Sequence, residues 1–276
     1  MHLARIVAVG VSAALALPAA PAHAAAALPG YDHIVVVVEE NHAFGKVIGN
    51  ARAPYLSSLA AAGATMSRSF AVTHPSEPNY LALFSGSTQG VADDSCPHTF
   101  STENLGHQLL AAGASFAGYS ESMPSVGYPG CTAGRYARKH NPWVNFPSVP
   151  SSSNLRFADF PPDPARLPSV AFVVPDLCHD MHDCNVPTGD AWLRDHLGGY
   201  ADWARTHNSL LVVTFDEDDH SAGNQIPTLF YGAHVATGSY PEPVTHYTVL
   251  RTLQALRGLP CTANSCDATA LTDIWN

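Results

Sequence analysis

The sequence predicts an α/β fold, a three-layer sandwich in which helices cover both faces of a central, mostly parallel sheet. Two continuous apolar runs, at residues 35–38 and 210–213, contain only valine and leucine. Runs of this kind are typical of strands that are buried on both faces of a sheet. Strand-like and helix-like segments also alternate along the chain, which favours parallel strands joined by helical crossovers.

The predicted strands are short apolar runs, and the predicted helices have apolar residues at helical spacing. We expect strands at residues 33–39, 65–72, 115–119, 170–174, 210–216 and 228–231. We expect helices near residues 54–62, 79–84, 105–112, 190–206 and 247–256. Residues 124–168 are rich in Pro, Ser, Gly and Asn, which predicts a long ordered excursion over the sheet.

The amino-terminal residues predict a secretory signal peptide. Arg5 precedes an apolar run at residues 6–17, and Ala22-His23-Ala24 is a small-x-small cleavage pattern. An apolar run of about a dozen residues is shorter than the ~20 needed to span a bilayer, so a membrane anchor is the weaker alternative. We therefore expect a signal peptide at residues 1–24, a secreted protein without a stable membrane anchor, and a single domain over residues 25–276.

The six cysteines follow the predicted signal peptide, at Cys96, Cys131, Cys178, Cys184, Cys261 and Cys266. An even number in an exported chain indicates disulfides. Fifteen pairings are possible; short separations favour Cys178–Cys184 and Cys261–Cys266, leaving Cys96 with Cys131, although the sequence alone does not settle the pairing. A zinc site is disfavoured because there is no CxxC pair.

The composition disfavours nucleic-acid partners. With 13 Lys and Arg against 23 Asp and Glu, the formal net charge is −10, which opposes binding to a phosphate backbone. The same charge would repel a phosphate ester unless the site supplies a positive charge from a metal ion, Arg, Lys or protonated His.

Polar residues follow the two most apolar strands. Glu40 and Asn41 come directly after the first, and Asp216 and Glu217 lie at the end of the second. Because sites in parallel sheets gather at the carboxyl ends of the strands, we expect these side chains to converge. Their oxygen atoms favour magnesium, calcium or manganese over zinc. A solvated polar turn is the alternative, and for either pair alone it is the simpler explanation.

Ser76 is the candidate nucleophile. It lies in the stretch His-Pro-Ser-Glu-Pro-Asn at residues 74–79, between a predicted strand and a helix expected to begin near Asn79. A serine at that place would face free helix N–H groups, which suits a phosphoryl oxygen. A capping serine is the alternative, and the local sequence does not distinguish the two.

Two polar loops supply histidines that could contact a phosphoryl group or protonate a leaving alkoxide. Residues 138–143 contain Lys139 and His140, and residues 180–183 contain His182. A structural role is the alternative for each histidine. Together with Asn79, Lys139 is a candidate for substrate binding.

A serine carboxyl esterase is the natural competitor. Residues 118–122, Gly-Tyr-Ser-Glu-Ser, come close to the nucleophile-elbow pattern but end in Ser where the pattern requires Gly. That assignment would also leave the two acidic strand ends without a role.

Several segments carry a family resemblance: VVVEENHAFGKVIGN, HPSEPNYLALFSG, YARKHNPWVNF, DMHD followed by GDAWL, NSLLVVTFDEDD, IPTLFYGAHV and HYTVLRTL. From about residue 31 to residue 275 the chain resembles the secreted acid phosphatases of the phosphoesterase family, which also contains bacterial phospholipases C, within the alkaline-phosphatase superfamily. The resemblance implies an alkaline-phosphatase-like fold and an enzyme that hydrolyses phosphomonoesters, with a phosphoinositide lipid among the candidate substrates. We expect a monomer, although the sequence leaves the oligomeric state open.

The resemblance also implies roles for individual residues. It places one divalent metal ion on Glu40, Asn41, Asp216 and Glu217, and makes Ser76 both the nucleophile and a further metal ligand. His140 and His182 match histidines that line the phosphate site of the acid phosphatases. The chain departs from the family at His220, where a glycine commonly follows the acidic cluster, and at Cys178 and Cys184, which bracket the DMHD segment.

Two other functions remain open from the sequence. A phospholipase C-like phosphodiesterase would need room for a second alkyl group at the phosphate, and the sequence does not reveal that room. A non-catalytic secreted protein that binds calcium or phosphate would bind metal without turnover and would tolerate replacement of Ser76.

Overall fold

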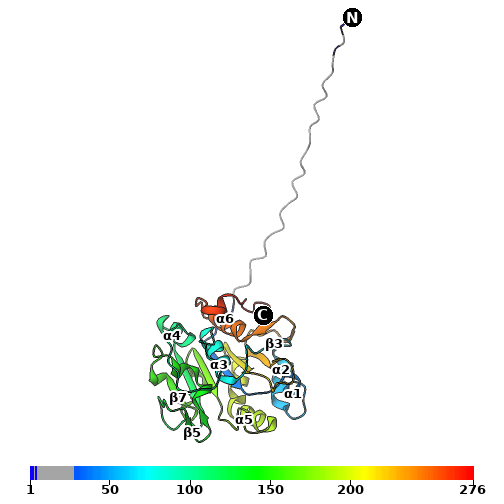
Figure 1. The fold of residues 1–276 in the computed structure, drawn as a ribbon. Helices are drawn as coiled ribbons and strands as arrows, with labels where there is room; N and C mark the ends of the chain where they lie inside the picture. Colours follow the sequence, from blue (N-terminus) through cyan, green and yellow to red (C-terminus); the bar gives the residue numbers. More distant parts are fainter. Residues whose placement is uncertain (3, 5–27) are drawn as a thin grey trace.

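The structure is a computed structural model that describes residues 1, 2, 4 and 28–276 (Figure 1). The predicted signal peptide at residues 1–24, and with it the start of the domain at residue 25, lies almost wholly outside the described residues, so both stay predictions. Within the described part of the chain, no helix is both long enough and apolar enough to cross a membrane.

An eight-stranded sheet forms the centre of the molecule, in the order β11-β2-β10-β9-β1-β8-β4-β7. The strands are β1 (His33–Glu39), β2 (Ala64–Met66), β4 (Phe116–Ser120), β7 (Asn154–Arg156), β8 (Val170–Val174), β9 (Ser209–Phe215), β10 (Thr228–Gly232) and β11 (Gly238–Tyr240). Strand β10 runs antiparallel to β9 and β2, and the other neighbouring strands pair in parallel. The predicted mostly parallel sheet is confirmed.

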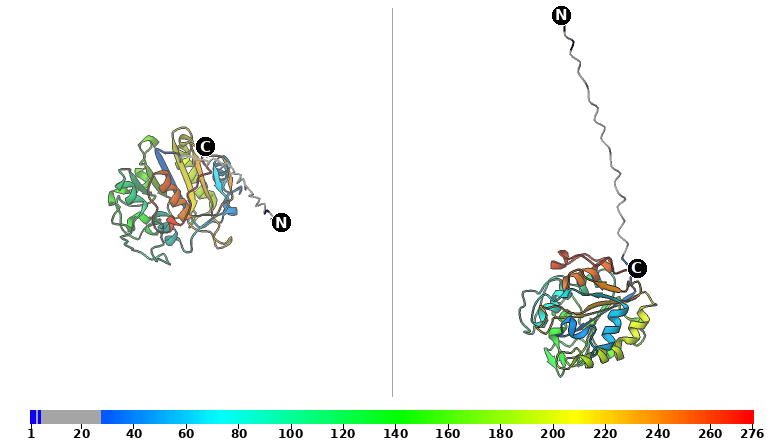
Figure 2. Two further views of the ribbon diagram at one scale, coloured as in Figure 1. Left: turned by 90° about the horizontal axis from the view of Figure 1, so that it is seen from above. Right: turned by 90° about the vertical axis from the view of Figure 1, so that its right-hand side faces the viewer.

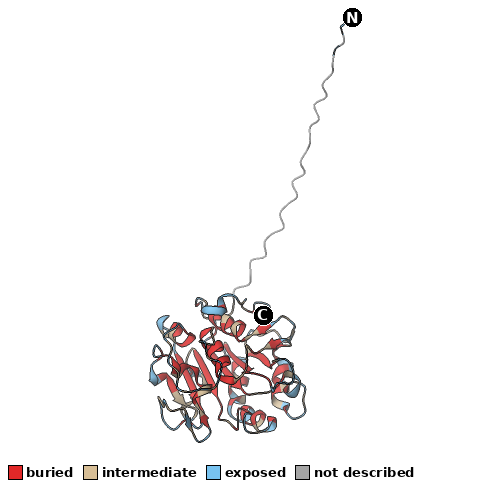
Figure 3. Ribbon diagram, in the orientation of Figure 1, coloured by how far each residue is buried: buried red, intermediate tan, exposed pale blue. Residues whose placement is uncertain are grey.

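Helices cover both faces of the sheet (Figures 1 and 2). The helices are α1 (Phe44–Val47), α2 (Pro54–Ala62), α3 (Ser76–Ser85), α4 (Leu105–Ala111), α5 (Val186–Ala204) and α6 (His246–Leu256). Side chains alternate between the faces of a strand, so Ile34 and Val36 of β1 pack with α3, α4 and α6, whereas Val35 and Val37 pack with α2 and α5. The predicted three-layer sandwich is confirmed, and Figure 3 shows its strands as buried.

Helix α3 begins at Ser76, three residues before the predicted start near Asn79. Residues 75–78 contain two prolines, at Pro75 and Pro78. In the structure Pro75 is the N-cap and Pro78 lies in the first turn. Backbone nitrogens of the first turn have no partner within the helix, so a proline is tolerated there. The earlier start places Ser76 itself at the amino end of the helix.

The segments around residues 65–72 and 124–168 differ from the expectation: the first contains less continuous strand, and the second contains more regular structure. The single strand expected at 65–72 is divided between β2 and β3 (Ser69–Phe70), and β3 pairs with β12 (Val244–Thr245) in a separate small sheet. The long excursion includes the hairpin of β5 (Thr132–Ala133) and β6 (Tyr136–Ala137). It also contributes β7, which adds an edge strand to the main sheet.

Three disulfides join Cys96 to Cys131, Cys178 to Cys184 and Cys261 to Cys266. This is the pairing that the short separations favour, and it is confirmed. The bonds indicate an oxidising environment, as found outside the cytosol.

Candidate active site

The polar residues predicted at the strand ends lie side by side. In the register of β1 and β9, Glu39 is level with Phe215, so the residues that follow them leave the sheet together. The backbone nitrogen of Asn41 donates to Asp216 Oδ1 at 3.1 Å, and the Asn41 side-chain amide donates to Glu40 Oε2 at 3.1 Å. Parallel pairing of the two strands therefore brings Glu40, Asn41 and Asp216 into one cluster.

Helix α3 adds the serine to this cluster. Ser76 Oγ lies 3.2 Å from Glu40 Oε2 and 3.4 Å from Glu217 Oε1, and the residue is buried. One turn later, the Tyr80 hydroxyl donates to Glu40 Oε1 at 2.5 Å. The structure thus brings together every residue that the sequence assigns to the metal site, although Glu40, Asp216 and Ser76 are far apart in the chain.

The cluster concentrates negative charge in a buried place. Burial, and to a smaller extent repulsion by Glu217, raises the pKa of Asp216 to about 8. Burial is the main reason that the pKa of Glu217 rises to about 7, and repulsion by Asp94 adds to it. Burial, followed by repulsion from Asp216 and Asp180, raises the pKa of Glu40 well above its usual value. Among the described residues, Asp216 Oδ2 has no hydrogen-bond partner. Buried carboxylates require a compensating charge, so this donor set fits a hard divalent cation.

His140 contacts Glu40 and is buried between two carboxyl groups. Its Nε2 is 3.1 Å from Glu40 Oε1 and its Nδ1 is 3.3 Å from Asp180 Oδ2. The ring stacks on Tyr80, and burial followed by repulsion from Lys139 lowers the pKa of His140 well below its usual value. Both ring nitrogens therefore face carboxyl groups in this arrangement, and the predicted contact between His140 and phosphate stays a prediction.

Lys139 and His182 lie at the rim of the cluster. Lys139 Nζ is 2.8 Å from Asp94 Oδ2 and 3.4 Å from His182 Nε2, and His182 Nδ1 is 2.8 Å from Asp183 Oδ1. The ring centroids of His140 and His182 are 5.9 Å apart. Because His140 contacts Glu40, the rim lies next to the buried carboxylates. Lys139 and His182 are partly exposed, which leaves them open to a bound ester.

Asn79 supports the turn before the serine. Its side-chain oxygen accepts hydrogen bonds from the backbone nitrogens of Val72 and Thr73, and its amide donates to the carbonyls of Thr73 and Pro75. The residue is fully buried. In this arrangement Asn79 shapes the backbone that presents Ser76, and its predicted contact with substrate stays a prediction.

Several residues of the site were not assigned to it from the sequence. Asp180 is the first residue of the DMHD segment; its carbonyl accepts a hydrogen bond from the Glu40 nitrogen at 2.8 Å. With Glu40 and His140 it forms a buried group that could hold a metal ion. His246, the first residue of α6, places Nε2 2.6 Å from the Asp216 carbonyl, and burial lowers its pKa to about 4. Only the acidic start of DMHD offered a sequence signal.

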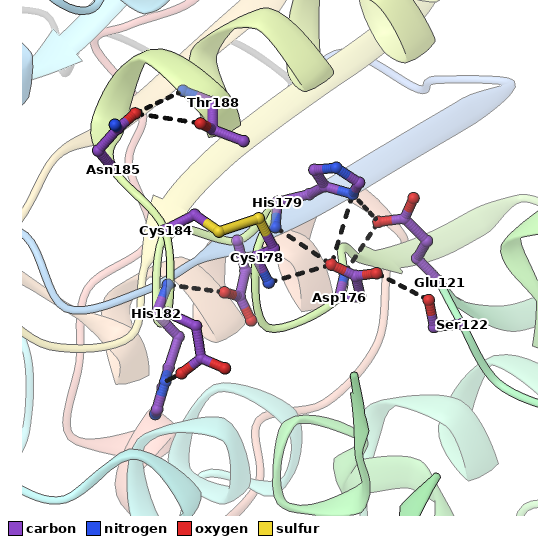
Figure 4. Close-up of a disulfide and its surroundings, with 11 residues drawn as sticks. Glu121, Ser122, Asp176, Cys178, His179, His182, Cys184, Asn185 and Thr188 are labelled. Atoms are coloured by element: carbon purple, nitrogen blue, oxygen red, sulfur yellow. Dashed lines mark hydrogen bonds and ion pairs between the residues drawn. A yellow bond between two sulfur atoms is a disulfide. The ribbon is translucent and has the colours of Figure 1, made fainter. Parts of the chain in front are cut away.

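A hydrogen-bonded loop carries Asp180 and His182, and Figure 4 shows how its base is fixed. Asp176 Oδ1 accepts hydrogen bonds from the backbone nitrogens of Cys178 and His179, and Asp176 Oδ2 accepts one from Ser122. His179 Nδ1 lies 2.8 Å from Glu121 Oε2. The Cys178–Cys184 disulfide then closes the loop over Asp180 and His182.

The carboxyl esterase pattern has no counterpart in the described structure. Ser120 is the last residue of strand β4, it is buried, and its hydroxyl donates to Asn141 Oδ1 at 2.5 Å. A nucleophile elbow would place the serine at the turn from a strand to a helix. Ser120 therefore has a structural role.

The fold is similar to that of solved structures in the alkaline-phosphatase superfamily. A protein of this superfamily from Vibrio parahaemolyticus aligns with a TM-score of 0.58 and 12% identity, covering 88% of this chain and 72% of that chain. A periplasmic domain of EptC from Escherichia coli aligns with a TM-score of 0.55 and 11% identity, covering 86% of this chain and 87% of that domain. Identities this low show the fold alone.

The sequence defines the family. The model of the Phosphoesterase family matches residues 50–260. The chain is 54% identical to a phosphatidylinositol-3-phosphatase of Mycobacterium tuberculosis, over 91% of this chain and 85% of that protein. It is 32% identical to an acid phosphatase of Aspergillus fumigatus, over 79% of this chain and 54% of that protein, so it spans about half the length of this fungal relative. The chain belongs to the phosphoesterase family, and the predicted phosphatase class is confirmed.

Proposed function

We propose that the protein is a secreted, metal-assisted phosphatase that hydrolyses phosphomonoesters through a phosphoserine on Ser76. The observation that carries this proposal is the position of Ser76 Oγ, at the amino end of α3 and within 3.4 Å of carboxylate oxygens of both Glu40 and Glu217. A serine that only caps a helix would not need buried acids around it from two strands that are far apart in the sequence.

The residues that would hold one magnesium, calcium or manganese ion are Glu40, Asn41, Ser76, Asp216 and Glu217. When bound, such an ion supplies the positive charge that the buried carboxylates lack, lowers the pKa of the serine hydroxyl and attracts phosphate oxygens. The support for this assignment is the donor set, which consists of oxygen atoms and includes carboxylates with raised pKa values.

The chain's own groups perform the remaining tasks. Ser76 Oγ attacks phosphorus, and Glu40 and Glu217 are the carboxylates within reach of its proton. The positive end of the α3 helix dipole, at Ser76, favours the anionic phosphoryl group. Lys139 adds charge at the rim, and His182 Nε2 lies 3.4 Å from its ammonium group, where it can protonate the leaving alkoxide. Water then attacks the phosphoserine and releases inorganic phosphate, which restores the serine hydroxyl.

The substrate we propose first is the phosphomonoester of a phosphoinositide head group. Support comes from the 54% identity to the mycobacterial phosphatidylinositol-3-phosphatase, which extends over most of both chains. The fungal relatives that are named acid phosphatases match a smaller share of their own length. A soluble phosphomonoester is therefore the second substrate to test, and a phosphodiester such as phosphatidylcholine is the third.

Replacement of the serine tests the proposal. We expect Ser76→Ala to lose phosphate release from phosphatidylinositol 3-phosphate by about 10³-fold or more, because no nucleophile remains. The matched control is Ser85→Ala, at the other end of the same helix and equally buried, which should keep its activity. Labelled phosphomonoester should also leave acid-stable phosphate on the wild type and none on Ser76→Ala.

Two outcomes would contradict the proposal. Wild-type turnover by Ser76→Ala would exclude the serine as nucleophile. A preference of the wild type for phosphatidylcholine over each phosphomonoester would assign the site to a phosphodiesterase.

A further inference from the structure

Two histidines stack beside the acidic cluster. His74 lies two residues before Ser76, and His220 follows the run of acids at residues 216–219. Their rings are nearly parallel, with an interplanar angle of 27° and centroids 3.9 Å apart. Neither residue has a task in the proposed chemistry, yet His74 contacts Glu217 and His220 stacks on His74.

His74 contacts the side of Glu217 that faces away from the serine. Its Nδ1 is 2.5 Å from Glu217 Oε2, whereas Ser76 lies against Glu217 Oε1. The other ring nitrogen, Nε2, is 3.4 Å from Asp218 Oδ1. Asp218 is fully buried as a side chain and accepts hydrogen bonds from the nitrogens of His220, Ala222 and Asn224. The His74 ring therefore connects Glu217 to a rigid turn.

The backbone at His220 has a conformation that is unfavourable for a residue with a side chain. Its φ is +61°, in the left-handed region that favours glycine. A residue with a Cβ atom is strained there by roughly 1–2 kcal/mol. An exposed histidine at this position gains little from burial, and its ring stacks on His74. Strain of this kind is often found at functional sites.

We propose that His74 and His220 form a positioning pair that fixes the orientation of Glu217 and so strengthens the binding of a divalent cation; this rests on the metal use in the proposed function. Glu217 Oε2 faces His74 while Oε1 stays beside Ser76, so the carboxylate cannot turn freely. The stacked His220 ring restrains His74 in turn. Residues that orient a metal ligand in this way typically change metal affinity by 10- to 100-fold when they are replaced.

Calorimetric titration of the metal-free, purified protein with Mn²⁺ tests the pair without a turnover assay. We expect His74→Ala to weaken Mn²⁺ binding by about 10- to 100-fold. His220→Gly should weaken it by a smaller factor, about 3- to 10-fold, because the His74 ring remains but is less restrained. His220→Phe keeps an aromatic ring on His74 and should stay within about twofold of the wild type.

His234 provides a matched control. It is also an exposed histidine with a positive φ, +60°, and it follows β10 at the opposite end of the neighbouring strand β9. His234→Gly makes the same replacement in the same backbone conformation and should leave Mn²⁺ affinity unchanged. Thermal unfolding of the metal-free variants separates folding from binding. Glycine suits a left-handed position, so His220→Gly should not unfold at a lower temperature than the wild type.

Wild-type Mn²⁺ affinity in both His74→Ala and His220→Gly would overturn the positioning pair and leave the proposed function intact. A wild-type protein that binds none of Mn²⁺, Mg²⁺ and Ca²⁺ would overturn the metal use, and the positioning pair with it. Equal weakening in His234→Gly and His220→Gly would show a general effect of glycine and would also overturn the pair.

Discussion

Lys139 brings a positive charge to the rim of a site that is otherwise rich in carboxylates. Asp94 holds its ammonium group at 2.8 Å, and Asp94 also accepts a hydrogen bond from the nitrogen of Glu77 in the first turn of α3. The lysine is thereby fixed relative to the helix that carries Ser76. A fixed cation at this place can attract a phosphate dianion before reaction and in the transition state alike.

We therefore expect Lys139→Gln to raise the KM for a phosphomonoester by about tenfold and to change kcat less, as for a group that binds substrate and transition state equally. Steady-state kinetics on a soluble phosphomonoester measure both constants. The other lysine of the sequence, Lys46, is exposed on α1, so Lys46→Gln is the control and should keep the wild-type KM. An unchanged KM in Lys139→Gln would exclude the lysine from substrate binding.

At the scale of residues, the sequence predicts those groups whose position follows from the end of a strand or the start of a helix. Glu40 and Asp216 could be predicted to meet because they follow two strongly apolar strands. Asp180 and His246 could not, because their contacts to Glu40 and Asp216 use backbone atoms that the fold brings together. Their side chains leave no spacing pattern in the sequence.

Among the elements, the loop between β8 and α5 contributes two residues to the site. It carries Asp180 and His182, and the Cys178–Cys184 disulfide closes it. The Cys261–Cys266 disulfide closes a loop of similar length, and this second loop packs at the carboxyl end of α3, where the Asn264 nitrogen donates to the Gly86 carbonyl. The two disulfides therefore lie toward opposite ends of the helix that begins with Ser76.

Removal of each disulfide in turn should show that both disulfides stabilise the fold and that only one of them supports activity. We expect Cys178→Ala with Cys184→Ala, and Cys261→Ala with Cys266→Ala, to lower the free energy of unfolding by about 2 kcal/mol each, because both loops are short. Only the first pair should lower kcat/KM, by about tenfold or more, since it frees the loop that positions His182. Denaturant unfolding and steady-state kinetics measure the two effects. Equal activity losses would contradict a specific role for the Cys178–Cys184 loop.

Elements with strong apolar patterns could be predicted well, and short ones could not. Strand β1 and helix α2 have the predicted bounds because their buried apolar residues form a clear pattern in the local sequence. Strand β7 has three residues within a segment rich in proline and serine, and its pairing with β4 at the edge of the sheet depends on tertiary contacts. The start of α3 was misplaced because Pro78 is tolerated in a first turn.

For the molecule as a whole, the buried acids link folding to pH and to metal. In the metal-free protein the pKa of Asp216 is about 8 and that of Glu217 about 7, above the values of about 3.9 and 4.3 in an unfolded chain. Groups with raised pKa values bind more protons when folded. Their contribution to stability is therefore fully present below pH ~4 and is lost as the pH rises through about 7 to 8.

The metal-free protein should accordingly unfold at a higher temperature at pH 5 than at pH 8. A divalent ion that binds the folded, ionised carboxylates should raise the unfolding temperature more at pH 8 than at pH 5. Thermal unfolding with a chelator and with Mg²⁺, Ca²⁺ or Mn²⁺ measures both effects, and Asp216→Asn should reduce the dependence on pH. A metal-free protein that is more stable at pH 8 than at pH 5 would contradict this account of the cluster.

The most direct test of the central claim is the anomalous scattering of Mn²⁺ in crystals of the protein. We predict one strong peak within coordination distance, about 2.0–2.6 Å, of the side-chain oxygens of Glu40, Asp216 and Glu217 and of Ser76 Oγ. A peak bound elsewhere, or none at this cluster when Mn²⁺ supports turnover, would contradict the assignment of Ser76 and the two strand ends to a single metal-assisted site.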